Sequence, residues 1–222
     1  METETKIRLS KLETELVQNK EWILTKHAII KKVYQLFGQL LETYKQISER
    51  EEVALPEFYK NSGGKISKGE NYQELPYVML DYPAVFSREN IFAIRTMFWW
   101  GNFFSISLHI SGKYFKKEKD FPKLLRYLEE KDFFVCVNET EWQHDFEPSN
   151  YIAAAALDER QLIEILKRNF LKISKNIELN RWNEAPQFLK KTFSEIVEFI
   201  KINFPDGEKV PLPGSPRAAT DL

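Results

Sequence analysis

The sequence predicts an α+β fold, in which long helices from both chain ends pack against a mostly antiparallel sheet of four or five strands. Residues 90–114 are rich in aromatic and β-branched side chains and are divided by Gly101-Asn102. Such a pair predicts a β-hairpin, because the first residue of a two-residue loop needs a positive φ. Near both chain ends, apolar residues recur at steps of three and four, which is the spacing of an amphipathic helix.

The hairpin is expected at the centre of the sheet, and a two-residue loop fixes its register. Trp100 then pairs with Phe103, and counting outward pairs Met97 with Ile106. Alternate residues of a strand point to opposite faces, so this register directs Arg95 to an apolar face. The opposite face combines aromatic rings with hydroxyl and imidazole groups, and it is expected to be covered by helices or to line a pocket.

The other elements follow from periodicity and from turn residues. Helices are expected at residues 4–18, 20–49, 121–131, 158–180 and 184–203, and further strands at residues 75–81 and 132–138. Residues 151–157 fit either a strand or a helical turn, and the polar residues 51–74 predict a surface loop. Residues 1–204 are therefore expected to form one domain with residues 1–50 as a helical arm, and the Pro-rich residues 205–222 predict a disordered tail.

The composition favours a cytoplasmic protein and excludes several classes of function. The chain of 222 residues has a formal net charge of −1, which argues against a nucleic-acid footprint over the whole surface. Its single cysteine, Cys136, excludes an intramolecular disulfide and favours a reducing compartment. The N-terminus lacks a signal-peptide pattern and no uncharged apolar run is long enough to cross a bilayer, so we expect no membrane association.

Two hairpin residues carry groups that are unusual for the interior of a sheet. Arg95 needs a partner if it is buried, and Asp81 is the nearest carboxylate on the preceding strand. The pair would be a structural ion pair or, as the functional alternative, a clamp for an anion. His109 is expected beside hydroxyl groups, as a hydrogen-bonded structural residue or as a binding residue. The candidate binding residues are Arg95, Thr96, Trp99, Trp100, Phe103, Ser105, Ser107 and His109.

Two weaker patterns lie after the hairpin. Glu141 and His144 have the i, i+3 spacing of a metal-ligand pair, but the pair occurs once and in a stretch that predicts a solvated acidic loop. We therefore expect no metal and no cofactor. Basic residues interleave with aromatic ones, as in proteins that track single-stranded nucleic acid, although acidic neighbours make a solvated surface the simpler interpretation. The basic residues are Lys113, Lys116, Lys117 and Lys119.

Two functions are compatible with these patterns. The first is a non-catalytic module that binds a protein partner or a small ligand through the aromatic hairpin, because tryptophans cluster at its turn. The alternative is a hydrolytic or nucleic-acid-processing enzyme that uses His109, Arg95 and Asp81. The predicted register directs Arg95 and His109 to opposite faces, so the binding module is preferred. A homodimer is a further alternative, because the predicted helix at 20–49 is long enough for a coiled coil, although Gly38 disfavours this pairing.

Overall fold

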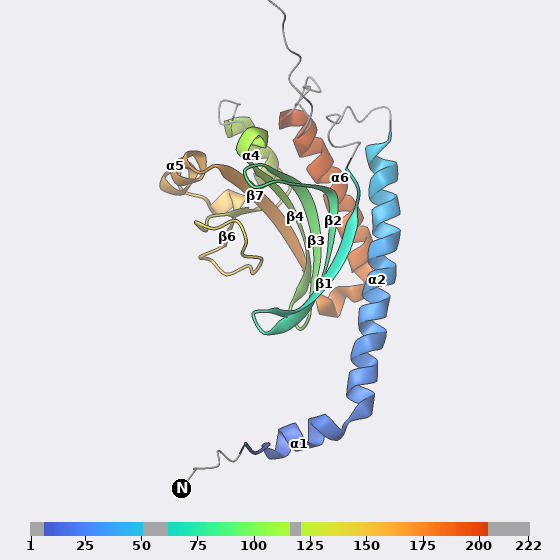
Figure 1. Ribbon diagram of the computed structural model, residues 1–222. Helices are drawn as coiled ribbons and strands as arrows, with labels where there is room; N and C mark the ends of the chain where they lie inside the picture. Colours follow the sequence, from blue (N-terminus) through green and yellow to red (C-terminus); the bar gives the residue numbers. More distant parts are fainter. Residues whose placement is uncertain (1–6, 51–61, 116–120, 204–222) are drawn as a thin grey trace, which may run out of the picture.

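The computed structural model describes residues 7–50, 62–115 and 121–203, and it has the predicted α+β class. Within these residues, seven antiparallel strands form one sheet in the order β1-β2-β3-β4-β7-β5-β6 (Figure 1). The strands are β1 (Lys65–Tyr72), β2 (Leu75–Phe86), β3 (Ile91–Trp99), β4 (Phe103–Ser111), β5 (Phe134–Cys136), β6 (Tyr151–Ala153) and β7 (Phe170–Glu178). The sheet is thus larger than the predicted four or five strands. The tail at 205–222 lies outside the described residues.

Two long helices cover one face of this sheet. These two are α2 (Lys20–Ser48) and α6 (Ala185–Asn203). The other helices of the described residues are α1 (Lys11–Gln18), α4 (Phe121–Glu130) and α5 (Glu159–Lys167). Figure 1 shows α2 and α6 side by side on the same face, while α1 extends away from the sheet. Residues 151–157, which fitted two alternatives, form β6 followed by a 3₁₀ turn, Ala154–Ala156.

The core between the helices and the sheet is built from large rings. In α2 the buried side chains follow helical spacing, and Tyr44 lies near the end of this stripe. The ring of Tyr44 stacks on that of Phe193 in α6, with ring centroids 3.8 Å apart. Its hydroxyl forms a 3.2 Å hydrogen bond with the hydroxyl of buried Thr96 on β3. Tyr44 therefore links α2 to α6 by ring stacking and to the sheet by a hydrogen bond.

Two strands lie where other structure was predicted. The predicted helix at 158–180 ends at Lys167, and β7 follows it. Phe170 and Ile173 continue the helical spacing of Leu162, Ile165 and Leu166, and this spacing led to the helix prediction. Leu171, Ile173 and Ile177 instead follow the alternation of a strand. At one edge of the sheet, β1 occupies part of the predicted loop at 51–74, because pairing with β2 satisfies the backbone of a polar segment. β2 also continues to Phe86 instead of ending at Asp81.

The central hairpin forms where it was predicted, but its register is shifted by one residue. A three-residue loop joins β3 to β4, so Trp99, and not Trp100, pairs with Phe103. Met97 likewise lies opposite Ser105. Every cross-strand pair predicted for this hairpin is therefore wrong by one residue. A shift of one residue reverses the face to which each side chain of a strand points.

The observed register is the one that gathers the apolar residues of both strands on the helix side. This face carries Phe92, Ile94, Phe98, Phe104, Ile106, Leu108 and Ile110, all of them buried in the main core. The same alternation directs Arg95 and His109 together to the opposite face, where the predicted register had separated them. Burial of the most apolar residues against α2 and α6 decides the register and leaves the polar ones to share a side.

The opposite face of the sheet is covered by residues 138–150, the segment between β5 and β6. Figure 1 shows this segment on the side of the sheet away from α2 and α6.

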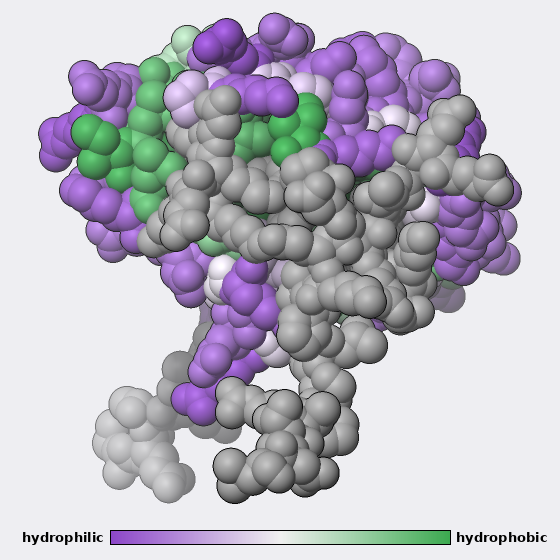
Figure 2. Space-filling model, turned by 90° about the horizontal axis from the view of Figure 1, so that it is seen from above, coloured by the Kyte–Doolittle hydropathy of each residue, from purple (hydrophilic) through white to green (hydrophobic). Residues whose placement is uncertain are grey.

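Viewed from the end where α4 lies, the described surface is mainly hydrophilic, with separate hydrophobic areas (Figure 2). In the described part of the chain, no helix combines the length and the apolar character that a bilayer span requires.

Candidate functional site

The eight predicted binding residues divide between the two faces of the sheet. Thr96 and Trp100 lie on the helix side, where Thr96 bonds to Tyr44. The other six share the opposite face, and they are Arg95, Trp99, Phe103, Ser105, Ser107 and His109. Trp99 is only 5% exposed, so of the two tryptophans at the turn it is not available at the surface for a partner. Most of the predicted binding residues therefore lie on the covered face of the sheet.

A row of polar side chains crosses four strands of the covered face. Asp81 on β2 lies opposite Arg95 on β3, which lies opposite Ser107 on β4 and then Ser174 on β7. The predicted ion pair is confirmed, since Arg95 Nε donates to Asp81 Oδ1 at 2.7 Å. The hydroxyls of Ser107 and Ser174 form a 2.9 Å hydrogen bond. Partners across the strands therefore orient most of this row before any ligand binds.

The adjacent row brings together a buried imidazole and a buried ammonium. His109 on β4 lies opposite Lys172 on β7, and both residues have no exposed surface. Lys172 Nζ donates to the main-chain carbonyl of Glu141 at 2.9 Å and also to that of Gln143. The carboxylate of Glu141 lies 3.6 Å from His109 Nε2. We call Arg95, Ser107, His109, Tyr151, Lys172 and Ser174 the polar layer, and residues 138–150 the cover.

Burial and the two cations determine the protonation states in the polar layer. Burial lowers the pKa of His109 to about 3, and the charges of Lys172 and Arg95 act in the same direction. Burial also lowers the pKa of Lys172 to about 8. The pKa of Glu141 rises because of burial, while Lys172 opposes this rise. At neutral pH His109 is therefore a neutral imidazole with one N–H donor and one acceptor nitrogen.

Polar atoms without a partner concentrate on this face. Among the described residues, the buried side-chain nitrogens and oxygens that lack a hydrogen-bond partner belong to Trp99, His109 and Tyr151. They are the indole Nε1, both imidazole nitrogens and the phenol oxygen. Such atoms cost free energy unless something else satisfies them. All three side chains lie on the covered face and none lies in the core beneath α2 and α6.

The cover is anchored to the sheet by hydrogen bonds at several points. The hydroxyl of Tyr72 on β1 accepts from the main-chain N–H of His144 at 2.7 Å. Arg168 donates to the carbonyls of Cys136 and Val137 at the start of the segment. Together with the bonds from Lys172, these contacts hold a segment without helix or strand against the polar layer. The segment is an irregular loop, as expected, but it is only partly solvated, because Glu141, His144 and Asp145 are half-buried.

The i, i+3 spacing of Glu141 and His144 does not place the two side chains on one helix face in this structure. Burial, aided by the charges of Lys172 and Arg95, lowers the pKa of His144 well below its usual value. Glu141 and His144 lie in the cover rather than on a helix. Over the described ranges, no group of three or more His, Cys, Asp or Glu residues is arranged to hold a metal ion. In the basic cluster, Lys116, Lys117 and Lys119 lie outside the described residues, and Lys113 lies over the Tyr114 ring.

Sequence reasoning missed half of the polar layer. Lys172 and Ser174 were assigned to a helix, and Tyr151 to a segment without a decided structure. The signal was present, because polar residues alternate with Leu171 and Ile173 along β7, as in a strand with one apolar face. The pairing of β7 with β4 is what places these residues beside His109 and Ser107.

Comparison of the chain with protein-family models, with curated proteins and with solved structures finds no match in any of the three searches. The function is therefore inferred from the geometry of the polar layer.

Proposed function

We propose that this protein binds a small oxyanion, a carboxylate or phosphate group, between the polar layer and the cover. The observation that carries the proposal is His109, which is fully buried and has no hydrogen-bond partner at either ring nitrogen. An N–H of this imidazole is a donor that an oxyanion would satisfy, and the hydroxyl of Tyr151 lies nearby, next to those of Ser107 and Ser174. The function is thus the small-ligand form of the binding module that the sequence suggested.

The charges around His109 favour an anion over a cation. Burial is the main cause of the low pKa of His109, and the charges of Lys172 and Arg95 lower this pKa further. The pKa of His144 in the cover is lowered by the same two cations. Lys172 and Arg95 therefore act on His109 in the polar layer and on His144 in the cover, and the charge of these two cations would stabilise a bound anion.

The residues of the enzyme alternative lie on one face of the sheet, but they make no contact typical of a catalytic site. The observed register brings Arg95, Asp81 and His109 to one side of the sheet, which the predicted register forbade. The hydroxyl of Ser107 bonds to Ser174, however, and His109 accepts from no hydroxyl group. A nucleophile within hydrogen-bond reach of its base is the signature of a hydrolytic site, so binding is the better-supported function.

Histidine signals provide a direct test, because the chain has three histidines and His27 is exposed on α2, away from the site. The ¹⁵N-labelled imidazoles are followed by NMR while acetate or inorganic phosphate is added at constant ionic strength. We expect the His109 and His144 signals to shift in a saturable way and the His27 signal to stay unchanged. Absence of a saturable shift at His109 with both anions would contradict the proposal.

A pair of lysine variants on one strand provides the matched control. Lys172→Met removes the buried ammonium from the polar layer, and we expect it to abolish the shift at His109. Lys175→Met removes a lysine that points to the helix side, where it pairs with Glu195 at 2.8 Å. This variant should keep the anion response. Equal responses of the two variants would mean that the anion binds elsewhere.

A further inference from the structure

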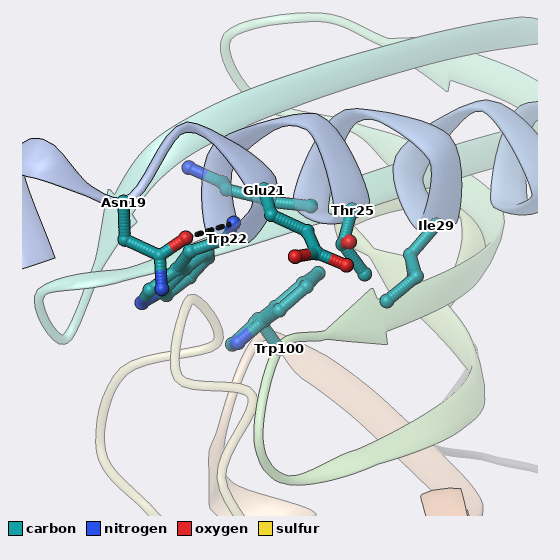
Figure 3. Close-up of a pocket in the computed structure, with 7 residues that line it drawn as sticks. Asn19, Glu21, Trp22, Thr25, Ile29 and Trp100 are labelled. Carbon is teal, nitrogen blue, oxygen red and sulfur yellow. Dashed lines mark hydrogen bonds between the residues drawn. The ribbon is translucent and has the colours of Figure 1, made fainter.

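A separate groove lies between the first turns of α2 and the turn of the hairpin. It has a volume of about 370 Å³ and is lined by Asn19, Glu21, Trp22, Thr25, Lys26, Ile29 and Trp100. Figure 3 shows the rings of Trp22 and Trp100 lying side by side, with the carboxylate of Glu21 directed toward Trp100. The side-chain oxygen of Asn19 accepts from the N–H of Trp22 at 3.0 Å and fixes the start of the helix.

The two indoles form an open aromatic pair. Their ring centroids are 6.2 Å apart and their planes differ by 12°. Trp22 remains 38% exposed, and Glu21 is exposed beside it. Lys26, the basic residue of the lining, is neutralised by Glu70 at a distance of 2.7 Å. The groove thus offers two ring faces and one uncompensated carboxylate, which more than offsets the partial positive charge at the start of α2.

We infer that this groove binds the alkylammonium group of a lysine side chain, unmodified or methylated, on a partner polypeptide. Aromatic faces attract such cations through their quadrupole, and a nearby carboxylate adds a direct charge interaction. A polypeptide suits the groove better than an isolated ion, because α1 and α2 carry exposed apolar side chains close in sequence to Trp22 that could contact the rest of a bound chain. These side chains are Leu16, Val17, Ile23 and Leu24.

The indole N–H signals of the full-length protein test this inference, since the chain contains five tryptophans. The probes are three short peptides that carry one lysine, one trimethyllysine or one acetyllysine between glycines. We expect the lysine and trimethyllysine peptides to shift the Trp22 and Trp100 signals, identified by Trp22→Phe and Trp100→Phe, while the neutral acetyllysine peptide does not. Binding of all three peptides with equal affinity would overturn the inference, because the charge would then have no role.

Glu21→Gln provides the second arm, because this exposed residue has no part in the core. We expect it to weaken binding of the trimethyllysine peptide by roughly three- to tenfold. Glu15→Gln, an exposed acidic residue on α1, should bind as the wild type does. A wild-type affinity in Glu21→Gln would overturn the assigned role of the carboxylate. Shifts caused by tetramethylammonium chloride alone, with no response to any peptide, would overturn the polypeptide as the ligand.

Discussion

The buried ammonium of Lys172 predicts a pH dependence of stability that a single substitution should remove. Its pKa falls from 10.5 to about 8 in the folded protein because of burial. Between these two pH values the unfolded chain binds the proton more strongly than the folded chain, so the free energy of unfolding rises with pH. The whole interval corresponds to roughly 3 kcal/mol, at about 1.4 kcal/mol for each unit of pKa.

Urea unfolding of the wild type and of Lys172→Met, between about pH 7 and pH 9.5, measures this contribution. Tyrosines and Cys136 titrate in both proteins, so the informative quantity is the difference between them at each pH. Between pH 8 and about pH 9.5, we expect the free energy of unfolding of the wild type to increase by about 2 kcal/mol relative to that of the variant. Ile173→Val weakens the same strand without removing a charge, and its curve should run parallel to the wild type. A difference between wild type and Lys172→Met that does not change with pH would refute the reasoning.

Three further predictions concern two glycines and the ion pair. Gly112 has a φ of 60°, and an added Cβ would lie 2.2 Å from the main-chain oxygen of Glu89. Gly112→Ala should therefore lower the free energy of unfolding by about 2 kcal/mol or more. Gly38→Ala, in a helix with open space around it, should raise the same quantity by about 0.5–1 kcal/mol. Thermal or urea unfolding checks both, and a Gly112→Ala variant as stable as the wild type would contradict the assigned strain. Asp81→Asn leaves the partly buried Arg95 without its partner, and it should cost about 3–5 kcal/mol. The double variant Asp81→Asn/Arg95→Met should recover much of this loss, and additive losses in a double-mutant cycle would show that the two charges are not coupled.

The local pattern of the chain was sufficient to predict the α+β class, the long helices and the position of the central hairpin. These features depend on residues close in sequence. The apolar stripe of α2 has one helical spacing over many turns, and the glycine at position 101 has the positive φ that its turn requires. The pairing of Arg95 with Asp81 was also within reach, because adjacent antiparallel strands bring such residues opposite each other.

The polar layer could not be predicted because it depends on how the two faces of the sheet are filled. A one-residue difference in the turn moved His109 to the side of Arg95, and the packing of apolar residues against α2 and α6 selected that register. Lys172 reaches the site only because β7, the last strand in sequence, pairs with β4. The groove likewise depends on the contact of Trp100 with Trp22, because these two residues lie far apart in the chain. The sequence alone determined the long helices and the central hairpin, through periodicity and turn residues, but it did not determine that β1 and β7 are strands. Only the tertiary structure decided which side chains meet, because burial of apolar surface is a property of the whole fold.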